Sequence, residues 1–226
     1  RPRRFGKSLL CSTLREIFLG NKALFKGLWI EKSDWIWDKH PVVHLNMTDA
    51  AGSSNTASRM VDKITQRLTS IADTYAIKLP KTDALDLLFS ILIEKLHKKT
   101  KKTVVVIIDE YDKPILDLVD NPDVRNDVHN ELRDFYAPLK SLEQHLRFVF
   151  LTGVYKFTQT SIFSNLNNLQ DLTFDRQAGT LIGYTEKELR EYFAPEVSLL
   201  ADSLGVTVTE VVTQLREKYN CYHFGV

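Results

Sequence analysis

The chain has 226 residues, and its 30 Lys and Arg against 29 Asp and Glu give a formal net charge of +1. A hydrophobic share of 43% and a charged share of 26% exclude a disordered or fibrous chain, and the near-neutral total excludes a globally basic protein but not a local basic site. Two cysteines, Cys11 and Cys221, are too few for a disulfide framework, and no stretch reaches the roughly 18 apolar residues of a membrane span. These features predict a cytoplasmic protein without a membrane segment.

The first half of the chain alternates helices with strands. A helix is expected over about Lys7–Phe18 and a strand over Val42–Met47. Apolar residues at three- and four-residue steps predict two amphipathic helices between Met60 and Leu96. Val104–Ile108 is a β-branched run without polar alternation, which is typical of a strand buried on both faces of a parallel sheet.

The second half continues the alternation and then becomes helical. Thr185 with Glu188 three residues later has the capping-box arrangement of a helix start, and Gly205 is a hinge between the last two helices. The class expected from strands alternating with long helices is α/β. The expected elements are a helix near Val124–Lys140, strands at Arg147–Leu151 and Leu172–Phe174, and helices at Thr185–Phe193, Glu196–Leu204 and Thr207–Tyr219.

Gly6-Lys7-Ser8 stands at the head of the first helix. Glycine lets the backbone curl around a phosphate, and the exposed N–H groups of a helix start point at an anion. In this pattern Lys7 reaches the terminal phosphates and the Ser8 hydroxyl is a ligand of Mg²⁺. The complete pattern places glycine six residues before the lysine, where this chain has Arg1.

Asp109-Glu110 follow the buried strand directly. Two adjacent carboxylates released at the end of such a strand are expected to serve a cation, with Asp109 holding Mg²⁺ through water and Glu110 acting as general base on the attacking water. Thr152 ends the next strand, where its hydroxyl can sense the γ-phosphate or orient that water. Each site also has a structural explanation: Gly-Lys-Ser can occur by chance, the acidic pair can cap a turn, and Thr152 can simply end a strand. The order of the three sites along the chain, taken together, favours the nucleotide interpretation.

At these residues the sequence resembles the AAA-ATPase-like family of bacterial proteins within the P-loop NTPases. RPRRFGKS resembles that family's own phosphate loop, in which the first position is not glycine. The resemblance covers most of the chain, through Arg1–Leu10, Val106–Leu116, Arg133–Lys140, Arg147–Phe157, Ser161–Asn168 and Leu181–Phe193.

The resemblance implies a three-layer P-loop fold with a mostly parallel sheet, whose first strand is absent from this chain, and ATP and Mg²⁺ as cofactors. It also implies a nucleotide switch for an attached PD-(D/E)XK-type nuclease or a bound partner, with any nucleic acid reached through that nuclease domain. We expect an ATPase-like core over residues 1–180 and a helical lid over 181–226 that ends in the start of a linker. The residues assigned to the nucleotide are Arg3, Arg4, Phe5, Gly6, Lys7, Ser8 and Leu9, those assigned to the metal are Ser8 and Asp109, and those assigned to catalysis are Glu110 and Thr152.

A homo-oligomer with an arginine finger supplied in trans stays open, and two other functions do as well. One is a vestigial or non-hydrolysing nucleotide-binding scaffold. The other is a DNA-reading helix-turn-helix in the last two helices, with Thr207, Thr209 and Gln214 facing a groove, although a recognition helix normally brings more cations than this one has.

Three smaller features carry expectations of their own. Asp112 and Lys113 are candidates for a local ion pair that positions Glu110. The lysine-rich segment Lys95–Lys102 is typical of a solvated helix end, with contact to a nucleic-acid backbone as the alternative. The aromatic residues of the connection after the first helix are expected in the core; they are Phe25, Trp29, Trp35 and Trp37.

Overall fold

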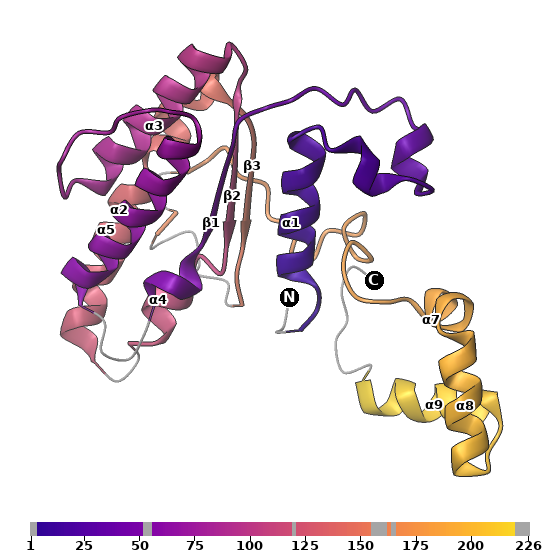
Figure 1. Ribbon diagram of the computed structural model, residues 1–226. Helices are drawn as coiled ribbons and strands as arrows, with labels where there is room; N and C mark the ends of the chain where they lie inside the picture. The colour runs from indigo at the N-terminus through magenta and orange to yellow at the C-terminus, as the bar shows by residue number, and fades with distance from the viewer. Residues whose placement is uncertain (1–3, 52–55, 119–120, 155–161, 164–165, 220–226) are drawn as a thin grey trace. The chain divides into compact units, whose positions relative to one another are not determined.

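A computed structural model describes residues 4–51, 56–118, 121–154, 162–163 and 166–219. The described chain forms two compact units. The larger unit is Lys7–Leu169, and the smaller one combines residues 170–219 with residues 4–6. Figure 1 shows the helices and strands of both.

The larger unit is built on a parallel three-stranded sheet. Its strands are β1 (Val42–Asn46), β2 (Val104–Asp109) and β3 (Leu146–Thr152), in the spatial order β1-β2-β3. The register pairs Asn46 with Asp109 and Asp109 with Thr152, so all three carboxyl ends lie at one edge. We call this the carboxyl edge of the sheet, and the opposite one the amino edge.

Helices cover both faces of this sheet (Figure 1). On one face, Cys11 and Phe18 of α1 (Lys7–Phe18) pack against alternate residues of β2, Val105 and Ile107. The other face packs against the amphipathic helices α2 (Ala57–Thr74), α3 (Leu85–Thr100) and α5 (Pro122–Tyr136). Every residue of β2 is buried, which confirms a strand covered on both sides and the α/β class.

Short elements join these layers. The helix expected over Val124–Lys140 is in fact two, because Pro138 lacks the N–H that would continue α5 and instead begins α6. Trp29 was expected in the core, but its side chain is 83% exposed. The short elements of the larger unit are η1 (Lys22–Phe25), η2 (Trp29–Lys32), η3 (Met47–Ala50), α4 (Lys113–Leu116), α6 (Pro138–Ser141) and η4 (Glu143–His145).

The smaller unit consists of three helices around a small core of its own. They are α7 (Glu186–Tyr192), α8 (Ala194–Leu204) and α9 (Val208–Tyr219), with Val197, Ala201, Val211 and Val212 buried between them. The capping box at Thr185 is present, and Gly205 ends α8 in the left-handed conformation (φ 66°) that glycine adopts without strain.

The strand expected at Leu172–Phe174 is absent, and that prediction was wrong. The segment forms turns, in which the Asp171 carboxylate accepts the Thr173 N–H at 2.9 Å. A short polar side chain that bonds the backbone two residues on competes with strand pairing. Among the described helices, none combines the length and the apolar character needed to cross a membrane.

Candidate functional site

The head of α1 has the backbone of an anion-binding turn. Gly6 precedes the helix with φ 88°, in the region where a side chain is strained, and Arg4 is also left-handed with φ 66°. The first N–H groups of a helix have no partner inside it, so they point at whatever lies beyond its end. Leu9 is 71% exposed and its side chain is apolar, so its backbone N–H is the group that can serve an anion.

The Ser8 hydroxyl connects this helix start to the end of the central strand. It donates a hydrogen bond of 2.5 Å to Oδ2 of Asp109, a residue 101 positions later in the chain. Asp109 is 1% exposed and Lys7 is 7% exposed, so a carboxylate and an ammonium are both buried here. Two buried groups of opposite charge at one sheet edge are costly unless they are paired or bind a ligand.

The second oxygen of Asp109 is suited to a cation. Its Oδ1 is buried and has no hydrogen-bond partner among the residues that the structure describes. A hydroxyl and a carboxylate are the hard oxygen ligands that Mg²⁺ takes, together with water and substrate phosphates. Ser8 and Asp109 therefore fit a magnesium ion, while in the described part of the chain no three His, Cys, Asp or Glu side chains could hold a metal by themselves.

Glu110 occupies an unusual backbone conformation. Its φ of 52° is left-handed, which costs a residue with a side chain about 1–2 kcal/mol. Its Oε2 accepts a hydrogen bond of 2.7 Å from the hydroxyl of Thr48, in η3 directly after β1. Thr48 was not predicted as a site residue, and the available signal in the sequence was a hydroxyl two residues beyond a strand that ends at the same edge as Asp109.

The segment that follows Glu110 is hydrogen-bonded to the end of β3. The Tyr111 N–H donates to the Thr152 carbonyl at 3.1 Å, and the buried Asp112 carboxylate accepts the Val154 N–H at 2.8 Å. A Cβ at Gly153 would lie 2.6 Å from the Asp112 carboxylate, so only glycine permits this approach. The expected ion pair of Asp112 with Lys113 is not the one observed, because Lys113 pairs with Asp117 one helical turn later and Asp112 accepts a backbone N–H just after β3.

The burial of α1 against the sheet also affects Cys11, one turn after Lys7. Burial, with the nearby Asp109 carboxylate as a second cause, raises the pKa of this thiol to about 12, while Lys7 acts in the opposite direction. Both charges of the site therefore act on the same thiol. Cys11 is a neutral, fully buried core residue and not a nucleophile.

The predicted site residues divide into three groups. Ser8, Asp109 and Thr152 come together at the carboxyl edge through the Ser8–Asp109 bond and the strand register, and Lys7 and Glu110 are their neighbours in the chain. Arg4 and Phe5 belong to the smaller unit, where a Cβ at Gly183 would lie 3.4 Å from the Phe5 ring. Arg3 lies outside the described residues.

Residues 1–163 match the family described as "Predicted AAA-ATPase". The chain belongs to this AAA-ATPase-like family. The match covers the head of α1, the acidic end of β2 and the end of β3.

A curated relative of this AAA-ATPase-like chain comes from Azotobacter chroococcum mcd 1 and is named "Uncharacterized protein in vnfD 5'region". It is 39% identical over 198 residues, which cover 87% of this chain and 38% of the relative. The chain thus spans well under half the length of this relative. No solved structure matches the chain.

Proposed function

We propose that this AAA-ATPase-like chain binds ATP at the carboxyl edge of its sheet and hydrolyses it in a Mg²⁺-dependent reaction. The observation that carries the proposal is the 2.5 Å bond from Ser8 to Asp109, beside the buried and unpartnered Oδ1 of the same carboxylate. It joins a helix start suited to phosphate with an acidic strand end suited to a cation. A magnesium ion held by these two side chains would take its remaining ligands from phosphate oxygens and water.

Each residue has a distinct part in this proposal. The ammonium of Lys7 and the N–H groups of the first turn of α1 neutralise phosphate charge. Ser8 and Asp109 would hold Mg²⁺, which supplies charge neutralisation and orientation of the phosphates when bound. Asp109 sits at the end of a strand in which every residue is buried.

Glu110 is the proposed general base, which accepts a proton from the attacking water. Its Oε2 is fixed by Thr48, and its left-handed backbone is followed by a segment tied to β3, so the carboxylate is positioned by two neighbouring strands. Thr152, whose Cα is in register with that of Asp109, is proposed to sense the γ-phosphate or orient the water. The output, control of an attached nuclease or a bound partner, rests on the family resemblance.

ATP turnover of the full-length protein tests the proposal. Glu110→Gln keeps the size of the side chain and its hydrogen bonding but cannot act as a base. Turnover is therefore expected to fall about 10²–10⁴-fold, while ATP binding, measured by thermal shift, is retained. Glu94→Gln, the same change at an exposed position of α3, serves as the matched control and keeps full turnover.

Two results would count against hydrolysis by this site. Turnover that is unchanged in Glu110→Gln removes Glu110 as the base. ATP binding without turnover in the unaltered protein favours instead the non-hydrolysing scaffold.

A further inference from the structure

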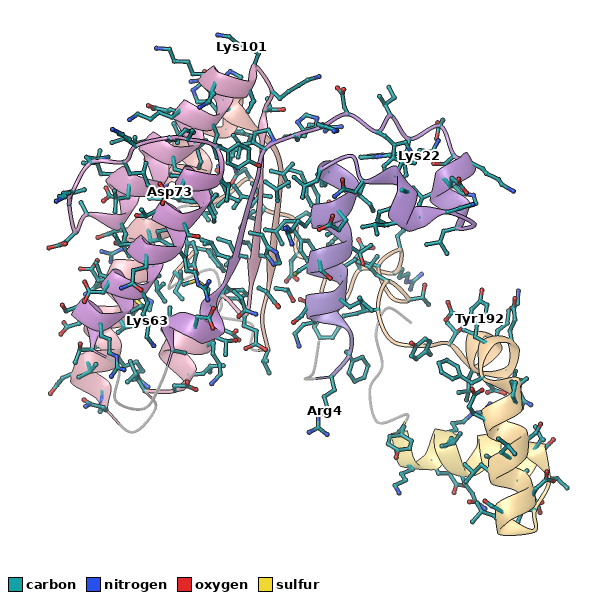
Figure 2. The ribbon with its side chains drawn as sticks, viewed as in Figure 1. Arg4, Lys22, Lys63, Asp73, Lys101 and Tyr192 are labelled. Atoms are coloured by element: carbon teal, nitrogen blue, oxygen red, sulfur yellow. The ribbon has the colours of Figure 1, made fainter. Side chains whose placement is uncertain are left out.

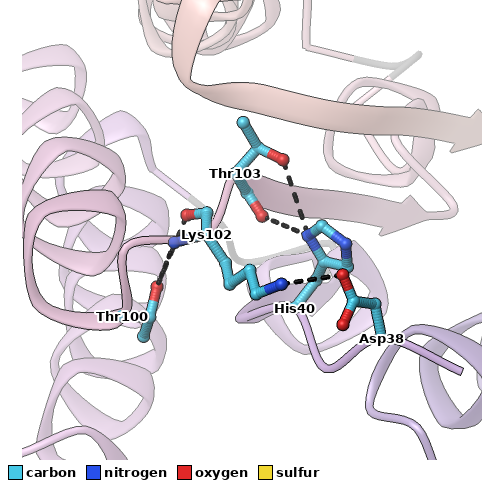
Figure 3. Close-up of polar contacts among 5 residues, drawn as sticks. All are labelled: Asp38, His40, Thr100, Lys102 and Thr103. Carbon is cyan, nitrogen blue, oxygen red and sulfur yellow. Dashed lines mark hydrogen bonds and ion pairs between the residues drawn. The ribbon is translucent and has the colours of Figure 1, made fainter.

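The parallel sheet brings three short segments together at its amino edge, opposite the proposed nucleotide site. They are residues 38–40 before β1, 95–103 before β2 and 143–147 leading into β3. The His40 ring contacts the Thr103 carbonyl at 2.8 Å, and the Lys102 ammonium donates to Asp38 at 2.7 Å (Figure 3). The ring centroids of His97 and His145 lie 4.7 Å apart, so the second segment contacts the third.

These segments are strongly basic although the whole chain is nearly neutral. They hold seven Lys or Arg side chains against two carboxylates, Asp38 and Glu143, in a chain whose total is +1. We call the seven cations the basic edge. They are Lys39, Lys95, Lys98, Lys99, Lys101, Lys102 and Arg147.

The basic edge is accessible and largely uncompensated. Six of its side chains belong to exposed residues, and Lys102, which pairs with Asp38, is half-buried. Lys95 and Lys99 donate to the backbone carbonyls of Lys78 and Ala76, which hold the ammonium groups without cancelling their charge. Figure 2 shows Lys101 projecting from the end of the unit, beyond α3.

We propose that the basic edge binds the phosphate backbone of nucleic acid. Neighbouring strands lie about 4.8 Å apart, so cations at the amino ends of successive strands lie close enough together to contact one polyanion. Lysine is depleted from protein–protein interfaces, whereas Lys and Arg are the usual partners of nucleic-acid phosphates. The expected binding is independent of sequence, because contacts to phosphates carry no sequence information.

Fluorescence anisotropy of a labelled DNA duplex with the full chain, in the absence of nucleotide, tests the proposal. The variant is Lys98→Glu with Lys101→Glu, which reverses two exposed charges of the edge. The matched control is Lys22→Glu with Lys26→Glu, which makes the same charge change at exposed positions of η1 and the turn after it. Circular dichroism verifies that both proteins fold.

The unaltered chain is expected to bind DNA with an affinity that falls steeply between about 50 and 200 mM salt. The edge variant should bind at least about tenfold more weakly and lose about two units of the salt slope, while the control keeps both. Equal losses in variant and control, or salt-independent binding, would overturn the proposal. So would tighter binding of polyglutamate than of DNA at equal charge concentration, which would identify an acidic protein as the partner.

Discussion

At the scale of single residues, the proposed site is organised around one carboxylate with two different oxygens. Oδ2 of Asp109 is bonded to Ser8, and Oδ1 is buried without a partner among the described residues. A buried oxygen without a partner is costly, and a bound cation would remove that cost. Glu110 next to it is held by Thr48 in a strained conformation, the kind of strain that is found at functional sites.

Thr48 is predicted to position Glu110. In Thr48→Val the carboxylate loses the donor to its Oε2 and gains rotational freedom, so kcat for ATP should fall about tenfold with KM unchanged. Thr48→Ser keeps the hydroxyl, so its kcat should match that of the unaltered protein. A purely structural role of Thr48 would not predict this dependence on the hydroxyl. Steady-state kinetics of the two variants give the answer, and a Val variant with wild-type or higher kcat would contradict positioning.

At the scale of elements, helix starts in the smaller unit depend on ionised carboxylates. Glu188 accepts the Thr185 N–H at 2.8 Å, and Glu210 accepts the Thr207 N–H at 2.7 Å. These backbone hydrogen bonds lower the pKa of both carboxyls below the ordinary value of 4.5. The Thr207 hydroxyl also donates to the Glu210 carboxylate and accepts the Glu210 N–H, so this side chain caps α9.

The capping contribution is therefore predicted to depend on pH with a known sign. A lowered folded-state pKa means that the stabilisation is complete above pH 4.5 and is lost as the pH falls through the folded value. The Thr185 amide resonance in an NMR titration should follow this protonation, with a midpoint below pH 4.5.

Glu188→Gln is the informative variant, because glutamine also completes a capping box but does not titrate in this range. It should abolish the titration seen at Thr185 and leave the one at Thr207 intact. A midpoint at or above 4.5 in the unaltered protein would contradict the prediction.

At the scale of the whole molecule, stability is concentrated in the larger unit. Its main core joins the sheet to α2, α3 and α5, whereas the smaller unit has a core of four buried residues. All three tryptophans lie in the larger unit, so their fluorescence reports on its unfolding alone.

Leu92→Ala is predicted to lower the free energy of unfolding of the larger unit by about 2–5 kcal/mol, because Leu92 is completely buried and truncation leaves a cavity. Leu87→Ala, on the same helix but 46% exposed, should change it by about 0.5 kcal/mol or less. Denaturant unfolding followed by tryptophan fluorescence measures both, and equal effects would refute the packing described for α3.

The sequence by itself determined the local elements and the chemistry available to them. Periodicity located α2 and α3, an unbroken apolar run identified β2, and residue types marked Ser8, Asp109 and Glu110, because these signals depend on near neighbours in the chain. The expected strand at Leu172–Phe174 failed because a strand needs a partner, and no local pattern supplies one.

Only the tertiary structure decided which distant groups meet. The order of three parallel strands brings Thr48 to Glu110 and the buried Asp112 to the backbone after β3, and the packing of α1 on the sheet brings Ser8 to Asp109. The same topology gathers seven cations from three separate segments at the opposite edge, which a net charge of +1 conceals. Charges distant in the chain become neighbours through strand pairing, and composition contains no information about that pairing.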